Sequence, residues 1–176
     1  MGVVTDAAAQ FGTRLAGYLP THLRETLALQ TFALTKVPML LYCAPRVVEL
    51  DAHTCAVRIP LTWRTRNHYG SMYFGALAVG ADVAGGLAAT YHIRASGRDV
   101  GLLFKSFEAD FLKRPEGDVV FRCADGEHLR KGVNDAIARG ERVNTPVRVL
   151  ATVPEHSGDT PVAEFVLTLS LKLARP

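Results

Sequence analysis

The segment from Ser71 to Ile93 constrains the fold more than any other part of the chain, because its 23 residues carry a single charge, Asp82. A helix of that length can cross a bilayer. An unpaired carboxylate at bilayer depth is costly, however, so enclosure by protein is the cheaper arrangement. We therefore predict a long helix from Met72 to about Arg94 that is surrounded by protein, and no membrane span.

The 176 residues are enough for one domain with a proper core, and 48% hydrophobic and 21% charged residues is the composition of a globular protein. The formal charge of +3 is too small to predict nucleic-acid binding. Cys43, Cys55 and Cys123 are far apart and lack CxxC spacing, so we expect reduced, buried thiols and neither a disulfide nor a metal site. No basic stretch followed by an apolar one begins the chain, and a cytoplasmic location is expected.

Residues 1–36 show helical patterns and are predicted to form an N-terminal extension, followed by one domain over residues 37–176. One helix is expected over residues 6–15. A second is expected to begin at an N-cap on Thr21, with apolar residues at helical spacing after it. Pro38 should kink or end that second helix, because proline removes a backbone donor.

After this extension the apolar pattern changes to a period of two, which is typical of strands. A hairpin is predicted over residues 48–59, with further strands at 106–111, 119–123, 147–153 and 165–171 and an amphipathic helix at 127–138. One uncharged helix beside a six-stranded, mostly antiparallel sheet is an α+β fold. The helix can be apolar around most of its circumference only if the sheet curls around it or a partner subunit covers it.

The candidate chemistry lies in the run Asn67-His68-Tyr69-Gly70-Ser71-Met72-Tyr73-Phe74-Gly75 and in Asp82. If the long helix begins around Ser71 to Phe74, its first backbone amides point towards the preceding loop and favour an oxyanion. Asp82 shares its helix face with Gly75, Gly85 and Gly86, which leave room for a ligand or another backbone. Burial should raise the pKa of Asp82 and make it a stronger base. The alternative is a structural acid that pairs with backbone amides or with an arginine across an interface.

These residues resemble hotdog-fold acyl-CoA thioesterases of the phenylacetate-pathway type, and more closely an uncharacterised, thioesterase-like branch of that superfamily. Such enzymes carry an Asn, two residues, a Gly, two residues, a His-Gly-Gly sequence, and a helical Asp seven residues beyond the last Gly. Asn67, Gly70, Gly75 and Asp82 occupy those places without a gap. The order of elements matches over roughly residues 37–175. The resemblance implies a hotdog fold, in which a curved antiparallel sheet wraps around a long central helix.

The resemblance also implies hydrolysis of a coenzyme A thioester to a free acid and CoA, with no cofactor other than the CoA of the substrate. Asp82 would act as general base on water or would attack the carbonyl itself. The backbone N–H of Phe74, beside Gly75, would stabilise the oxyanion, and Asn67 would orient water or the carbonyl. A homodimer or a dimer of dimers is implied, with the active site at the subunit interface.

Five further residues are expected to contact the substrate: Arg66, His68, Tyr69, Gly70 and Tyr73. The default for a lone loop histidine, as for a surface cation, is a solvated side chain. Coenzyme A phosphates require cations near the mouth of the site, and the candidates are Arg64, Arg66, Arg94, Arg98, Lys105, Lys113, Arg114, Arg130 and Lys131. Trp63 and Tyr69 either line an acyl tunnel or pack on the loop, and packing is the expectation for Trp63.

Two positions depart from the family pattern, because Tyr73-Phe74 stands where the family has His-Gly. Two aromatic rings narrow the entrance, so the alternative function is a non-catalytic module that binds acyl-CoA or fatty-acyl groups. A hotdog hydratase is disfavoured because Leu87 stands where those enzymes carry a His. No GxSxG, P-loop or HExxH motif occurs. A third possibility is a protein that binds a partner through its N-terminal extension.

Overall fold

The computed structural model describes residues 20–174. Its helices are α2 (Thr21–Thr35), α3 (Pro38–Cys43), α4 (Phe74–Ser96), α5 (Gly126–Arg139) and α6 (Pro154–Ser157). Its strands are β1 (Arg46–Leu50), β2 (Cys55–Ile59), β3 (Val100–Phe111), β4 (Val119–Cys123), β5 (Val143–Thr152) and β6 (Pro161–Leu173). The helix expected over residues 6–15 lies outside the described residues.

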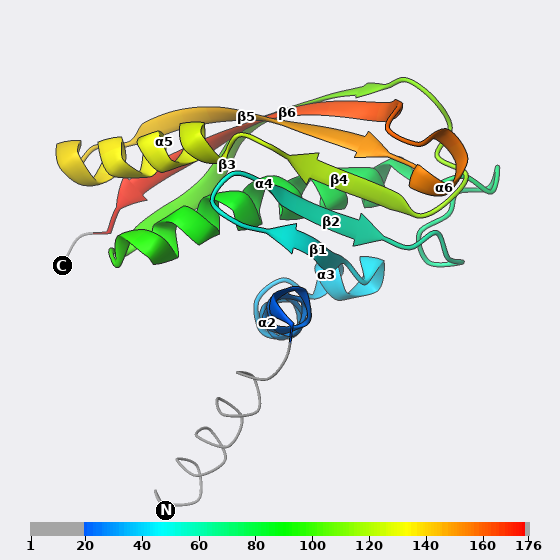
Figure 1. Cartoon of the computed structure of the whole chain (residues 1–176), viewed down its shortest axis with the longest axis horizontal. Helices are drawn as coiled ribbons and strands as arrows, with labels where there is room; N and C mark the ends of the chain where they lie inside the picture. Colours follow the sequence, from blue (N-terminus) through cyan, green and yellow to red (C-terminus); the bar gives the residue numbers. More distant parts are fainter. Residues whose placement is uncertain (1–19, 175–176) are drawn as a thin grey trace, which may run out of the picture.

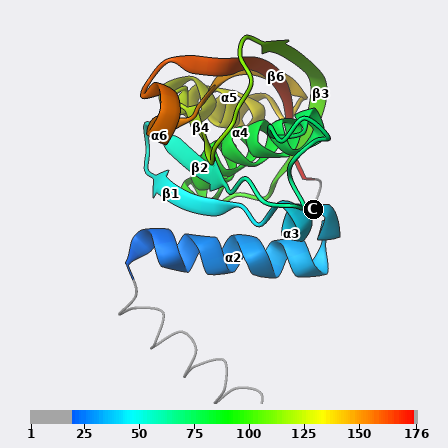
Figure 2. The ribbon, with the colours of Figure 1, turned by 90° about the vertical axis from the view of Figure 1, so that its right-hand side faces the viewer.

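The six strands form one antiparallel sheet in the order β1-β2-β4-β5-β6-β3 (Figure 1). Seen end-on in Figure 2, the sheet curves around α4, with β1 and β3 at its two edges. The side chains that alternate inwards from β4, β5 and β6 are fully buried, among them Phe121, Val149 and Leu167. Burial of each such side chain contributes roughly 1.5–3 kcal/mol to the free energy of folding. The expected α+β architecture, a curved sheet around one long helix, is confirmed.

Small residues let α4 lie close to the sheet. A side chain at Gly80 would overlap the ring of Phe121, and one at Gly85 would touch Val147. In the described part of the chain α4 is the one helix whose length and hydropathy match a membrane span. More than half of its most apolar window is buried inside the protein. The lack of charge in this segment therefore reflects a core helix.

Helix α2 covers the β1 edge of the sheet. The Thr26 hydroxyl accepts a hydrogen bond from the Val47 N–H at 2.9 Å, and the Gln30 amide donates to the Pro45 carbonyl at 2.8 Å. Leu29 and Ala33, on the same side of α2, are buried in the main core. Side chains of α2 thus satisfy backbone groups that an edge strand would otherwise leave open.

The predicted boundaries differ from the structure in a few places. Helix α2 has Pro20 at its N-cap, one residue before the expected Thr21. It ends at Thr35, and Pro38 opens α3 as its first residue, where its missing N–H costs nothing. The short helix α6 and the first half of β3 were not predicted.

Strand β3 is the opposite edge of the sheet and is left uncovered. Its inward side chains include Phe104, Phe107 and Phe111, and each of them stays partly exposed. Helix α4 lies over β2, β4 and β5 and has few contacts with this edge. The strand therefore ends the sheet with unpaired backbone groups and exposed aromatic rings.

Candidate active site

The loop before α4 is held in shape by its own polar groups. The Asn67 side chain donates to the Ser71 hydroxyl at 3.0 Å and accepts from the Tyr69 N–H at 2.9 Å. The Asn67 N–H also bonds to the Ser71 carbonyl at 2.8 Å, which closes the loop. Gly70 takes a φ of 85° at the tip, a conformation that favours glycine. In this structure the Asn67 amide shapes the loop, and its predicted contact with water or substrate remains a prediction.

Helix α4 begins where this loop is fastened to the rest of the domain. The Tyr73 N–H donates to the Thr65 carbonyl at 2.8 Å, and the Met72 N–H donates to the Pro115 carbonyl at 2.9 Å. Phe74 is the first helical residue. Within residues 20–174 the N–H groups of Phe74 and Gly75 have no backbone or side-chain acceptor. They are therefore free to bind an oxygen.

A hollow of about 540 Å³ lies at this end of α4. It is lined by Asn67, His68, Tyr69, Ser71, Met72, Tyr73, Phe74, Leu77, Phe111, Leu112, Lys113, Arg114 and Pro115. Aromatic and aliphatic groups dominate this wall, as in pockets for apolar ligands. The hollow brings together Asn67, His68, Tyr69, Tyr73 and Phe74 from the sequence prediction, but it does not include Arg66, Gly70 or Gly75.

The close packing of the Tyr73 ring explains why residue 75 is a glycine. A Cβ on Gly75 would come within 2.5 Å of the Tyr73 ring, which lies against the ring of Phe74 with 4.7 Å between the centroids. The Phe74 ring in turn meets Phe111 edge-on, at 6.4 Å. Gly75 therefore allows the two aromatic rings that replace His-Gly to fold over the start of α4.

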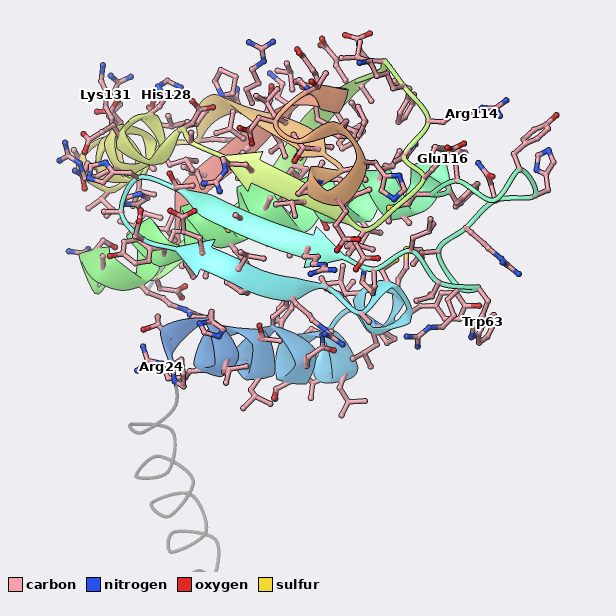
Figure 3. The ribbon with its side chains drawn as sticks, turned by 45° about the vertical axis from the view of Figure 1, so that its right-hand side comes forward. Arg24, Trp63, Arg114, Glu116, His128 and Lys131 are labelled. Carbon is pink, nitrogen blue, oxygen red and sulfur yellow. The ribbon has the colours of Figure 1, made fainter. Side chains whose placement is uncertain are left out.

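Two cations among the nine candidates line the hollow, Lys113 and Arg114. The Arg114 guanidinium lies over the Tyr69 ring, 5.2 Å from its centroid, at the end of the molecule labelled in Figure 3. Two other candidates are engaged elsewhere, since Arg94 bonds to Glu25 and Arg130 bonds to Glu127. Sequence reasoning did not single out the loop after β3, because nothing in its pattern connects it with residues 67–74.

Asp82 lies on the side of α4 that faces β3. Four residues further along, and so on the same face, a side chain at Gly86 would meet the Phe104 ring at 3.6 Å. Burial raises the pKa of Asp82 from 3.8 to about 6. In the part of the chain that the structure describes, its carboxylate has neither a hydrogen-bond donor nor a cation for a partner. The structure therefore does not pair Asp82 with backbone amides of its own chain, and pairing with an arginine across an interface stays the other interpretation of this residue.

Asp82 and the amide of Phe74 do not meet within one copy of the chain. Eight residues of helix separate them, which is about 12 Å along the axis. Asp82 is also absent from the lining of the hollow. In a single copy the free amides at the start of α4 and the Asp82 carboxylate are therefore two separate places along this helix.

Other reactive groups in the described residues are buried and offer no metal site. The three cysteines are free and buried, and desolvation raises their pKa values, that of Cys55 to about 12. No cluster of three or more metal-binding side chains occurs among residues 20–174. The His92 Nε2 is buried without a hydrogen-bond partner, and burial lowers the pKa of that imidazole.

The expectation that Trp63 packs on the loop is wrong. Its side chain is 72% exposed and meets only the edge of Tyr42, with 6.3 Å between the ring centroids. The Arg64 guanidinium lies on the same Tyr42 ring, 5.9 Å from the centroid. Trp63 is also absent from the lining of the hollow, so it does not form an acyl tunnel within this chain.

Comparison with known proteins agrees with this architecture. A family model described as a domain of unknown function, DUF4442, matches residues 26–171. A protein of unknown function from Pseudomonas aeruginosa, named as a probable thioesterase, is similar with a TM-score of 0.69 and 24% identity, over 89% of this chain and 97% of that one. A protein of unknown function from Chlorobaculum tepidum gives 0.74 and 14%, over 88% and 98%.

A thioesterase family protein from Silicibacter pomeroyi gives a TM-score of 0.61 and 16% identity, over 87% of this chain and 99% of that one. No curated protein matches the chain. At these identities the likeness establishes the fold alone, and that fold is the hotdog.

Proposed function

The chain belongs to the DUF4442 family, and on that footing we propose that it is an acyl-CoA thioesterase whose active site is shared between two copies. The observation that carries this proposal is Asp82, a half-buried carboxylate without a partner in the described residues, whose pKa is raised to about 6. The free amides of Phe74 and Gly75 lie about 12 Å away along α4, where the Phe74 ring meets Phe111 of the open strand β3. A base that ionises near neutral pH and an oxyanion site are the two groups that thioester hydrolysis needs.

Pairing of β3 with β3 of a second copy would bring these groups together. Two-fold symmetry requires such a pair to be antiparallel. Helix α4 runs antiparallel to β3, since Phe74 meets Phe111 and Gly86 faces Phe104. With the axis level with a point midway between Phe74 and Asp82, in the C-terminal half of β3, the partner's Asp82 would lie opposite the free amides at the start of α4.

Hydrolysis would proceed with the acyl group in the aromatic hollow and the thioester carbonyl oxygen on the Phe74 N–H. The partner's Asp82 would take a proton from water as the water oxygen attacks the carbonyl carbon. The negative charge that develops on the carbonyl oxygen would be held by the helix amides. The carbon–sulfur bond then breaks, the CoA sulfur takes the proton from Asp82, and the acid is released.

Lys113 and Arg114 are the cations that we propose for the phosphates of coenzyme A, because they lie at the hollow. We also propose that the protein acts in the cytoplasm, where its three free cysteines would stay reduced.

The aromatic pair Tyr73-Phe74 favours a second candidate, a non-catalytic acyl-CoA binding protein. The two rings lie at the mouth of the hollow and occupy space that His-Gly would leave open. Such a protein would hold acyl-CoA tightly without releasing thiol.

Thiol release from a panel of acyl-CoAs distinguishes the two functions. The wild type should release CoA, and Asp82→Asn should lower kcat by roughly 10²–10⁴-fold while leaving the fold intact. Unchanged turnover in Asp82→Asn would remove Asp82 from the mechanism. Acyl-CoA binding by the wild type without any turnover would establish the binding protein instead.

A further inference from the structure

Large apolar side chains are exposed on a surface that the proposed active site does not use. We call it the α2 face, formed by Leu23, Leu27 and Leu34 of α2, Met39 and Tyr42 of α3, and Trp63. Leu27 is 57% exposed, and Leu34 and Met39 are each 67% exposed. An apolar patch of this kind, bordered by polar residues, is typical of an interaction site.

The α2 face is one continuous surface. Leu23, Leu27 and Leu34 follow the spacing of a single helical stripe, away from the buried Leu29 and Ala33. Helix α3 packs against α2, and its Tyr42 meets Trp63. In Figure 3, Arg24 and Trp63 mark the two ends of this side of the molecule.

The charge around this face is one-sided. Residues 20–43 and 61–66 hold four cations, Arg24, Lys36, Arg64 and Arg66, and one carboxylate, Glu25. Their formal charge is +3, so the rest of the chain, whose total is also +3, carries no net charge. Glu25 is itself mostly buried, 3.7 Å from Arg24 and 3.3 Å from Arg94.

Three cations on the outer face of the sheet, Arg58, Arg122 and Arg148, are paired with carboxylates, Asp118, Glu49 and Glu164 respectively. Arg46, which lies opposite Arg58 on that face, has no ion pair in the described residues. Lys36, Arg64 and Arg66 have none either. The cations next to the apolar side chains of the α2 face are thus available to an anionic partner.

We propose that the α2 face docks the protein on the surface of an anionic lipid bilayer. Leu27, Leu34 and Met39 enter the boundary between headgroups and acyl chains, and the cations meet anionic headgroups. Trp63 lies at the level of the headgroups, where exposed tryptophan is favoured. A second copy fits this face poorly, because two copies would bring together two surfaces of the same positive charge.

Docking would place the bilayer beside the acyl pocket. Trp63 precedes Asn67 by four residues in the same loop, and the carbonyl of Thr65 in that loop fastens the start of α4. An acyl group that partitions into the bilayer would therefore lie near the hollow. The docking itself does not depend on the proposed hydrolysis.

Trp63 is the single tryptophan of the chain, so its fluorescence reports on this surface directly. The full chain is mixed with vesicles of phosphatidylcholine alone or with phosphatidylglycerol added. With the anionic vesicles we expect a shift of the Trp63 emission to shorter wavelength and quenching by brominated lipid, both reversed by high salt. Vesicles of phosphatidylcholine alone should give neither effect.

Variants remote from the tryptophan separate docking from a local effect on Trp63. Leu27→Ser/Leu34→Ser should raise the lipid concentration needed for the shift by at least about tenfold. Lys36→Glu, which reverses one charge, should raise it by roughly 25-fold. Val166→Ser, an exposed apolar residue on the outer face of the sheet, is the matched control and should bind as the wild type does.

Three outcomes would overturn the proposal. One is no emission shift of the wild type with anionic vesicles, and another is an equal loss in the Val166→Ser control. The third is a Leu27→Ser/Leu34→Ser variant that binds vesicles normally but has a lower molar mass than the wild type, because the α2 face would then join two copies.

Discussion

The two edge strands of the sheet differ in that β1 is covered by a helix and β3 is not. At the β1 edge, Thr26 and Gln30 of α2 bond to the backbone at Val47 and Pro45. At the β3 edge no element of the described chain pairs with the outer side of the strand, and three aromatic rings remain partly exposed. The backbone groups at the β1 edge are therefore partly satisfied within a single copy, whereas those on the outer side of β3 are open to pairing with a partner.

This difference also divides the central helix. The side of α4 that faces the middle of the sheet is closed by contacts such as that of Gly80 with Phe121. The side that faces β3 holds Asp82, and at the start of the helix, where the N–H of Phe74 is free, the Phe74 ring meets Phe111 of β3. The groups suited to chemistry thus lie on the unfinished side, and the following experiments test whether a second copy completes it.

The largest effect is expected from a charge placed on the open edge. Phe107→Glu puts a carboxylate among apolar groups of the proposed interface, which should halve the molar mass measured by light scattering and abolish thiol release. Val48→Glu makes the same change at an exposed position beside the closed edge, and it should leave both properties unchanged. A Phe107→Glu protein that keeps the wild-type molar mass would show that β3 is not the interface.

The proposed oxyanion site can be tested by removing a single backbone N–H, that of residue 74. Phe74→Pro removes the backbone N–H at the first helical position, where proline is tolerated, and Tyr73 already has the extended backbone that proline requires. We expect kcat to fall by roughly 10²–10³-fold. Phe74→Ala removes the ring and keeps the N–H, so it serves as the control. Equal kcat values in the two variants would exclude the amide.

The unpaired carboxylate should make stability depend on pH. Because the pKa of Asp82 is about 6 in the folded state and 3.8 ordinarily, unfolded chains ionise first, and the wild type loses stability as the pH rises from about 4 through 6. Relative to the wild type, Asp82→Asn should gain on the order of 2–3 kcal/mol between pH 4 and pH 8, as measured by urea unfolding. A difference that stays constant across this range would mean that Asp82 is not desolvated.

The smallest effect is expected at the closed edge. Thr26→Val leaves the Val47 N–H without its acceptor and should cost about 1 kcal/mol of unfolding free energy. Thr31→Val, on the exposed side of α2, is the matched control and should cost less. A Thr26→Val protein that also dissociates into single copies would contradict the division between the two edges.

Much of this architecture follows from periodicity in the sequence. Alternation predicted the hairpin of β1 and β2, and the uncharged segment predicted α4. The first half of β3 was missed because a register shift between Phe104 and Ser106 interrupts the alternation. The exposure of Trp63 depends on which neighbours the fold brings to its loop, and no local pattern encodes that.

Some residues of the candidate site could likewise be predicted from the sequence, and others could not. The Asn67–Gly75 run and Asp82 could be found because they are close in sequence and match a motif. Lys113 and Arg114 reach the hollow only because β3 runs beside α4, a tertiary relation. That Asp82 faces the open edge likewise became visible only from the contact between Gly86 and Phe104.

Mixed dimers test the shared site most directly. Phe74→Pro and Asp82→Asn chains are produced together with different tags, and thiol release is measured on the unseparated mixture against each parent. Random pairing makes half of the dimers mixed, and each mixed dimer holds one site with an intact amide and the partner's intact Asp82. The shared site predicts recovery to about a quarter of the wild-type rate, by this pairing arithmetic. Activity no higher than that of the two parents would contradict it, because a site built within one chain stays broken in every mixed dimer.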